Sequence, residues 1–135
     1  MRANKSYFLF GKLAILFIPL LYGCGVDIEN GEQAFQRCVS CHSMRLGVNY
    51  TGPSLAGVFG RQAGTITDFN YSDAVRTSGV VWSEENLDAW LTNPQLFIPG
   101  TKMEFEGISD RSVREELIVI LKSKTTISLA GDSLP

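Results

Sequence analysis

A C-x-x-C-H motif, formed by Cys38, Cys41 and His42, constrains this 135-residue chain more than any other feature. Two thiols at this spacing can form thioether bonds to the two vinyl groups of one haem, and the histidine that follows is placed to ligate its iron. A zinc site needs four soft ligands, and only the distant Cys24 is left to add to these three. A redox disulfide needs a thioredoxin-like βαβ context, which the sequence does not predict. The motif therefore predicts one covalent haem c.

A second axial ligand has to come from a methionine, because His42 is the only histidine. Met44 follows His42 by two residues and stays on the same side of the ring. Met103 lies 61 residues beyond His42, in a loop that Pro99 stiffens and Gly100 turns. His42 and Met103 are therefore the predicted iron ligands, an arrangement that raises the reduction potential. The alternative is that Met103 only fills the core.

The N-terminus has the pattern of an export signal, assigned to residues 1–23. Basic residues precede ten uncharged residues, 13–22, a run too short to span a bilayer by itself. Cys24 then resembles the lipidated cysteine of a bacterial lipoprotein. Two alternatives stay open: cleavage after Gly25, which would release a soluble protein, or retention of residues 7–26 as a transmembrane anchor. All three place the domain on the periplasmic side of a bacterial membrane.

Charge argues against nucleic acid as a partner. Residues 24–135 carry nine basic and 14 acidic side chains, a net charge of −5. Nucleic acids and acidic membrane surfaces attract clustered lysine and arginine, which this segment does not provide. We expect a monomeric domain that meets the membrane through its N-terminus alone.

Periodicity predicts an all-α domain over residues 31–124, with a short tether at 24–30 and a flexible tail at 125–135, because no segment alternates with a period of two. Helices are expected at 31–39, at 71–77, from the cap Ser83 to Asn93-Pro94, and from about Ser109 to Lys124. Their apolar sides are formed by Ala34 and Phe35, by Leu87, Trp90 and Leu91, and by Val113, Leu117, Ile120 and Leu121. Such short helices leave a meagre core, which a large apolar cofactor would complete.

Residues 31–124 resemble a class I cytochrome c of the mitochondrial and bacterial cytochrome c2 branch. The matching segments, in the family's order and spacing, are Thr51–Leu55, Val58–Arg61, Phe69–Ala74, Trp82 and Ile98–Met103. The resemblance implies the class I cytochrome c fold, with four to five short helices and loops wrapped around one haem. It also implies a one-electron carrier rather than an enzyme.

The resemblance implies roles for five residues outside the motif. Pro53 matches the proline whose carbonyl accepts the second ring N–H of the ligating histidine. Arg61, Tyr71 and Trp82 match positions that hydrogen-bond the buried haem propionates. Thr101 matches the threonine beside the methionine ligand, which bonds a propionate or an inner water.

Two further features follow from the same comparison. Gly31 and Phe35 match the contact of the first helix with the last, where a small residue permits a close crossing. The ring of lysines around the exposed haem edge is largely missing, because Gln95 and Leu96 occupy two of its positions while Lys102 remains. Docking through a strongly positive face is therefore not expected.

The expected partners are redox complexes of a respiratory or photosynthetic membrane: a quinol–cytochrome c reductase, and a terminal oxidase or a reaction centre. Two alternatives stay open. The chain could be the haem subunit of a larger oxidase, or a small haem enzyme or sensor, which would need an open iron site and a distal acid–base group.

Overall fold

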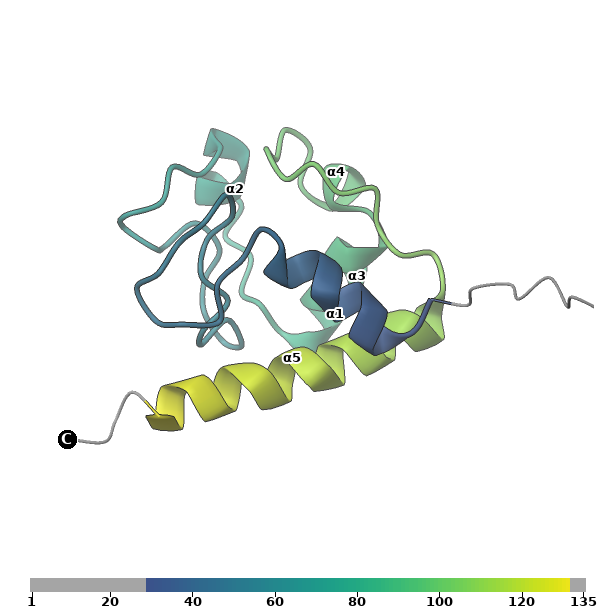
Figure 1. Cartoon of the computed structure of the whole chain (residues 1–135). Helices are drawn as coiled ribbons and strands as arrows, with labels where there is room; N and C mark the ends of the chain where they lie inside the picture. The colour runs from purple at the N-terminus through teal and green to yellow at the C-terminus, as the bar shows by residue number, and fades with distance from the viewer. Residues whose placement is uncertain (1–28, 132–135) are drawn as a thin grey trace, which may run out of the picture.

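The computed structural model describes residues 29–131, with side chains described up to Thr125. Five helices follow one another in this part of the chain (Figure 1): α1 (Gly31–Val39), α2 (Asp73–Thr77), α3 (Glu84–Thr92), α4 (Pro94–Phe97) and α5 (Arg111–Gly131). The predictions for the signal segment, for Cys24 and for most of the tether lie outside the described residues.

Backbone pairing of the β type is limited, within residues 29–131, to one isolated antiparallel bridge between Gln62 and Val81. The prediction of an all-α fold is therefore confirmed. None of the helices in the described range has the length and apolar character needed to cross a membrane.

Helix α1 begins where the sequence predicts, because Asn30 and Gln33 form a capping box. The Asn30 side chain accepts the Gln33 backbone N–H at 2.9 Å, and the Gln33 side chain accepts the Asn30 N–H at 3.0 Å. Ala34 and Phe35 are buried on the inner side of the helix, as expected.

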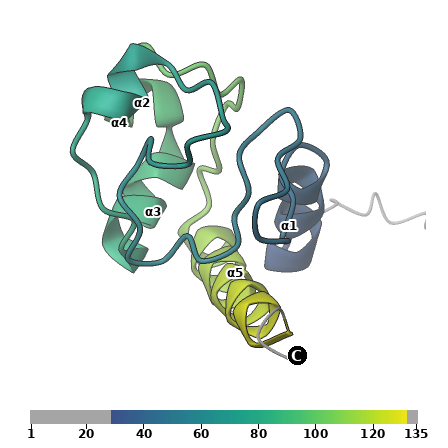
Figure 2. The same cartoon turned by 90° about the vertical axis from the view of Figure 1, so that its left-hand side faces the viewer.

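Helices α1 and α5 cross at close range, which Figures 1 and 2 show from two directions. A Cβ added to Gly31 would lie 2.4 Å from Cβ of Glu116 and 2.9 Å from the Leu117 backbone nitrogen. The Gly31 N–H also donates to Oε2 of Glu116 at 2.9 Å. The close contact of the first and last helices that Gly31 and Phe35 predict is therefore present.

Helix α4 is an element that the sequence reading missed. Asn93 and Pro94 were expected only to end the preceding helix, and α3 does end at Thr92. The Asn93 side chain then accepts the Leu96 N–H at 3.0 Å and caps a second helix, with Pro94 in its first turn. Proline at a first helical position costs nothing, because its missing N–H would have no partner there.

Helix α5 is longer than predicted. The sequence predicts that this helix ends at Lys124, whereas residues 125–131 are helical and continue α5 to Gly131. Thr125 is buried one turn after Leu121, and its hydroxyl donates to the Leu121 carbonyl at 2.8 Å. Since no proline or glycine interrupts residues 125–130, the helix propagates past its last lysine.

Helix α2 begins at Asp73 rather than at Tyr71, because Ser72 is its N-cap. The Ser72 hydroxyl accepts the Val75 N–H at 3.3 Å. Tyr71 therefore belongs to the preceding loop.

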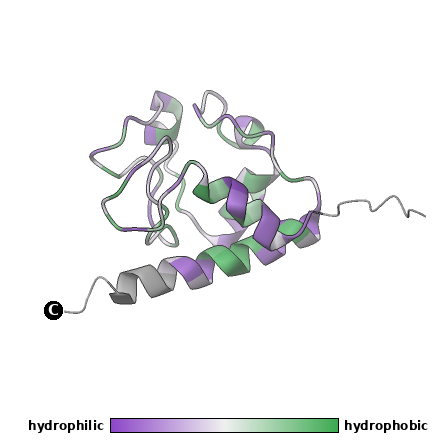
Figure 3. Ribbon diagram, in the orientation of Figure 1, coloured by the Kyte–Doolittle hydropathy of each residue, from purple (hydrophilic) through white to green (hydrophobic). Residues whose placement is uncertain are grey.

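One cluster of buried apolar side chains joins the helices: Ala34, Phe35, Val58, Ala63, Val75, Trp82, Leu87, Trp90, Leu91, Ile98, Ile108, Val113, Leu117, Ile118 and Leu121. In Figure 3 strongly apolar residues gather where α3 meets the middle of α5, while α1 turns polar residues toward the viewer. Arg114 of α5 is buried and bonds Asp88 of α3 at 2.7 Å, which ties these helices together.

Candidate haem site

The C-x-x-C-H residues come from a single turn at the end of α1. The Cys41 and His42 N–H groups both donate to the Cys38 carbonyl, at 3.1 and 2.9 Å, and so wrap the chain around it. Cys38 is half-buried and Cys41 is exposed. Burial raises the pKa of the Cys38 thiol to about 11, so this thiol is protonated at neutral pH. The structure therefore brings together the two predicted attachment cysteines and His42, the predicted iron ligand.

The His42 ring is held in one orientation by the loop that contains Pro53. Nδ1 of His42 lies 2.7 Å from the Pro53 carbonyl oxygen. Because a carbonyl can only accept, Nδ1 donates, and the lone pair of a neutral ring is left on Nε2. Burial lowers the pKa of His42, against an opposing effect of the Pro53 contact, and so favours the neutral form that binds metals.

The backbone of Gly52 packs directly against this ring. A Cβ at Gly52 would lie 2.4 Å from Cε1 and 2.6 Å from Nδ1 of His42. The Gly52 N–H donates to the Cys41 carbonyl at 2.8 Å, which pins the loop to the turn that carries the motif. Glycine is thus required here by the closeness of the ring.

Ser54 is a buried polar residue in this loop to which the sequence reading gave no role. Its hydroxyl donates to the Arg45 carbonyl at 2.7 Å, and its N–H donates to the Asn49 side chain at 2.9 Å. The only available signal was its place directly after Pro53 in the segment that matches the family.

Arg61 makes contacts that the sequence did not predict. Its Nη1 donates to the Ala56 carbonyl at 2.7 Å, and its Nη2 donates to the Ser54 carbonyl at 2.8 Å. The side chain is half-buried, and burial lowers the pKa of its guanidinium. Arg61 therefore holds the loop that contains Ser54. The N–H groups of its guanidinium that do not bind these carbonyls are available to an anionic group.

Tyr71 and Trp82 lie near Arg61. Burial raises the pKa of Tyr71, and the Arg61 charge opposes this shift, so the two side chains are close enough to interact. The Trp82 backbone N–H donates to the Arg61 carbonyl at 3.0 Å, and its ring packs edge-on against Trp90 at 5.3 Å. Their contacts to haem propionates stay predictions.

Met103 lies half-buried in an irregular segment, residues 98–110, which we call the strap. The Thr101 hydroxyl is buried and accepts the Met103 N–H at 3.2 Å. Gln95 of α4 donates through Nε2 to the Met103 carbonyl at 3.1 Å and to the Thr101 carbonyl at 3.2 Å. The resemblance implies that Thr101 bonds a propionate or an inner water, which stays a prediction. Neither its bond to the Met103 N–H nor the support from Gln95 is marked in the sequence.

The residues present fit a haem. A further set of apolar or sulfur-bearing side chains packs against the core while staying partly open: Cys38, Val39, Met44, Leu55, Phe59, Tyr71, Ala74, Val80, Phe97, Met103, Phe105 and Ile120. Cys38, Tyr71 and Met103 in this set belong to the predicted haem site, and partly open apolar surface of this kind is what a large flat cofactor would bury. Together with two thiols, a neutral imidazole with a free Nε2 and a half-buried cation, they match the needs of a haem with acidic side groups.

Comparison with known proteins decides the family. The family model for cytochrome c matches residues 28–114 of the chain. The chain belongs to the cytochrome c family. A cytochrome c from Euglena viridis is 43% identical over 98 residues, which cover 72% of this chain and 96% of that protein. A cytochrome c2 from Blastochloris viridis is 42% identical over 111 residues, 82% of this chain and 87% of that protein.

A solved structure gives the same result. Cytochrome cH from Methylobacterium extorquens superimposes with a TM-score of 0.64 at 41% identity, covering 69% of this chain and 94% of that one. The predicted class I cytochrome c fold and the covalent c-type haem are therefore confirmed. As a cytochrome c, the chain is a haem-based electron carrier.

Proposed function

We propose that this cytochrome c is a periplasmic one-electron carrier in which Cys38 and Cys41 attach the haem and His42 and Met103 ligate its iron. The observation that carries the proposal is the 2.7 Å contact from Nδ1 of His42 to the Pro53 carbonyl, which leaves Nε2 free to bind a metal. Bound haem would supply an iron that takes up and releases one electron.

The chain's own residues would hold this centre rigid. Gly52 and Pro53 fix the plane and tautomer of the His42 ring. Thr101 occupies the Met103 N–H, so the backbone beside the thioether has a defined position. Two ligands held in this way would move little when the iron gains or loses an electron, which suits rapid electron transfer.

Arg61, Tyr71 and Trp82 are proposed to surround the haem propionates. Arg61 is half-buried and cationic, and it lies within electrostatic range of Tyr71. A buried anion needs such a partner, because burial of an unpaired charge is costly. Thr101 completes the set from the strap.

The surface beside Met103 would meet redox partners, for which we propose a quinol–cytochrome c reductase and a terminal oxidase or reaction centre. Leu96 is 79% exposed, and Phe97 and Phe105 are half-buried nearby in the chain. Lys102 shares the strap with Glu104 and Glu106, so this surface has mixed charge. Short-lived docking through a small, mainly apolar contact fits a carrier that must leave quickly.

We also propose that residues 1–23 direct export, that Cys24 is lipidated, and that residues 24–30 tether the domain to the membrane. The bacterial cytochrome c2 and cH relatives support a periplasmic location, while lipidation and the tether rest on the basic and apolar pattern before Cys24 alone. A tether raises the effective concentration of the domain near its partners, which reduces the need for steering by charge.

The first test is an optical spectrum of the haem-loaded protein and of Met103→Ala. The wild type should show a low-spin c-type spectrum and, when oxidised, the weak far-red band typical of iron–methionine ligation in this family. Met103→Ala should lose that band, because no other methionine of the described chain lies on the strap. A high-spin wild-type spectrum that Met103→Ala leaves unchanged would contradict the ligation and favour an open-iron enzyme or sensor.

A further inference from the structure

The strap that carries Met103 has no helix of its own, so contacts from neighbouring elements decide where it lies. Its C-terminal end is firmly fixed. The Ile108 N–H donates to the Leu91 carbonyl at 2.8 Å, and Nη1 of the buried Arg114 donates to the Ile108 carbonyl at 2.9 Å. A Cβ on Gly107 would lie 2.1 Å from the Thr92 carbonyl oxygen, so the two backbones touch there.

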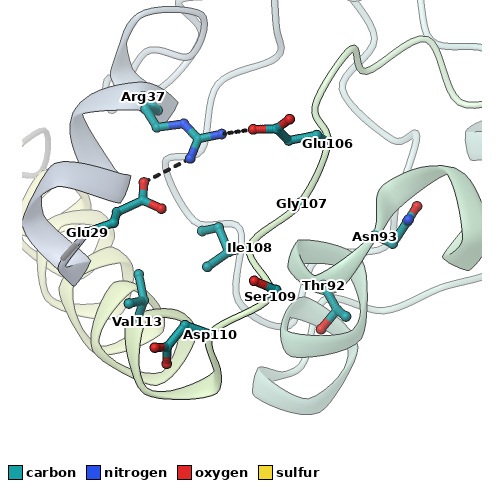
Figure 4. A pocket seen from close by; sticks show the side chains of 10 residues that line it. All are labelled: Glu29, Arg37, Thr92, Asn93, Glu106, Gly107, Ile108, Ser109, Asp110 and Val113. Atoms are coloured by element: carbon teal, nitrogen blue, oxygen red, sulfur yellow. Dashed lines mark hydrogen bonds and ion pairs between the residues drawn. The ribbon is translucent and has the colours of Figure 1, made fainter. Parts of the chain in front are cut away.

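A second, weaker contact reaches the strap from α1. The Arg37 guanidinium lies 4.7 Å from the centre of the Phe105 ring. It also lies 3.6 Å from the Glu106 carboxylate and pairs with Glu29 at 2.8 Å (Figure 4). Glu106 is 86% exposed, so water screens this ion pair. These contacts fix the part of the strap that lies C-terminal to Met103, and not Met103 itself.

Beside Met103 the decisive contact comes from α4. We propose that Gln95 is a positioning residue that holds Met103 in place as an iron ligand. One amide nitrogen, Nε2, donates to the carbonyls of Thr101 and Met103, at 3.2 and 3.1 Å. A side-chain amide carries two hydrogens, so each carbonyl receives its own.

The support behind Gln95 is itself rigid. Asn93 caps α4, and Pro94, the residue directly before Gln95, is fully buried. Gln95 therefore projects from a fixed turn, and its amide ties that turn to both residues that flank Lys102. The Thr101 hydroxyl takes the Met103 N–H at 3.2 Å, so the N–H and the carbonyl of Met103 are both engaged.

This inference rests on the proposed ligation by Met103. For the thioether to leave the iron, the strap has to move, and movement of the strap separates the Thr101 and Met103 carbonyls from Gln95. Loss of these hydrogen bonds adds to the barrier for release of Met103. Gln95 should therefore slow the exchange of Met103 for an external ligand without being a ligand itself.

The test uses haem-loaded Gln95→Ala. It measures the rate at which added imidazole replaces Met103, and this rate is monitored by the loss of the far-red band. One to two exposed hydrogen bonds correspond to a rate increase of about three- to tenfold. Gln95→Glu keeps the shape but removes both donors, and should also accelerate exchange. The reduction potential and the hydrogen exchange of the Met103 amide provide readouts that do not depend on electron-transfer activity.

Gln36→Ala is the matched control. Gln36 is an exposed glutamine on α1 whose Nε2 donates to Glu32 at 3.1 Å, within the same helix. It should leave the imidazole rate unchanged. If Met103→Ala abolishes the band but both Gln95 variants exchange at the wild-type rate, the role of Gln95 is refuted and the ligation stands. If Met103→Ala retains the band, the ligation and the role of Gln95 both fail.

Discussion

At the scale of single residues, three backbone contacts fix the position and ring of His42, the proposed iron ligand. The backbone N–H of His42 donates to the Cys38 carbonyl, Nδ1 contacts the Pro53 carbonyl, and the backbone of Gly52 lies against the ring. Each contact comes from backbone rather than from another side chain. The orientation of the ligand is therefore built into the path of the main chain.

Gly52→Ala tests this arrangement. The new Cβ would lie 2.4 Å from Cε1 of His42, so the ring or the loop has to move. We expect a loss of about 3 kcal/mol in the free energy of unfolding, the upper part of the range for overpacking, with a changed haem spectrum. Urea unfolding of the haem-loaded protein, followed by absorbance, would measure both.

Gly47→Ala serves as the comparison. Nothing lies within 4 Å of its added Cβ, and only the backbone φ of +69° opposes the change. It should cost about 1 kcal/mol and leave the spectrum unchanged. Gly52, unlike Gly47, lies outside the left-handed region, so a loss no larger than that of Gly47→Ala, with an unchanged spectrum, would contradict a clash with the His42 ring.

The sequence predicted which residues come together where they are close in the chain. It did not predict contacts that depend on how distant loops fold back on one another. Cys38, Cys41 and His42 meet because they share one turn. The contacts of Arg61 with the Ala56 and Ser54 carbonyls depend on how the loop folds back. Gln95 is eight residues from Met103, and no periodicity relates a one-turn helix to an irregular strap.

At the scale of elements, helices α1 and α5 cross so closely that a methyl group added at Gly31 would clash with α5. The backbone at Gly31 approaches Glu116 so closely that its Cβ position is already occupied. Leu117, the next residue of α5, is fully buried beneath it. The small residue at the start of α1 thus sets the distance between the two helices.

Gly31→Ala should separate these helices. Its Cβ would lie 2.4 Å from Cβ of Glu116 and 2.9 Å from backbone atoms of α5, which a side-chain rotation cannot relieve. We expect a loss of about 2 kcal/mol in the free energy of unfolding. Thermal unfolding by circular dichroism would measure it, with Gln36→Ala on the same helix expected to change stability by less than about 0.5 kcal/mol. Unchanged stability of Gly31→Ala would disprove a tight crossing.

Helix prediction failed where one residue serves two elements. Asn93 ends α3 and caps α4, and a pattern that marks a stop does not reveal that a new helix starts there. The end of α5 was misplaced for another reason. Its lysines suit a C-terminus but do not terminate a helix, and Thr125 continues the buried stripe of Leu117 and Leu121.

At the scale of the whole molecule, helices as short as α2 and α4 provide a small protein core, which a cofactor is expected to complete. The short helices other than α4 could be anticipated, and so could the need for a cofactor. The packing of the loops could not, because it relies on hydrogen bonds between distant residues. Examples are the Gly60 N–H with the Trp82 carbonyl at 3.0 Å and the Ala63 N–H with the Val80 carbonyl at 2.7 Å.

Attachment to the membrane belongs to this scale. We expect wild-type protein expressed in a bacterium to fractionate with membranes and to carry lipid on Cys24, detectable by mass spectrometry of the mature N-terminus. Cys24→Ser should lose the lipid, while the haem spectrum stays unchanged because the substitution lies outside residues 31–124. A soluble wild type would favour cleavage after Gly25, and an unprocessed membrane-bound one would favour an anchor of residues 7–26.

The partnership of α1 with α5 has a consequence for the order in which the molecule is assembled. A chain delivered from its N-terminus exposes α1 and the two attachment cysteines long before α5 has emerged. Because the place of α1 is against Glu116 and Leu117, the fold cannot close until the last helix arrives. We therefore expect Cys38 and Cys41, the proposed attachment residues, to stay accessible during that interval, which would allow the cofactor to be attached before the fold closes.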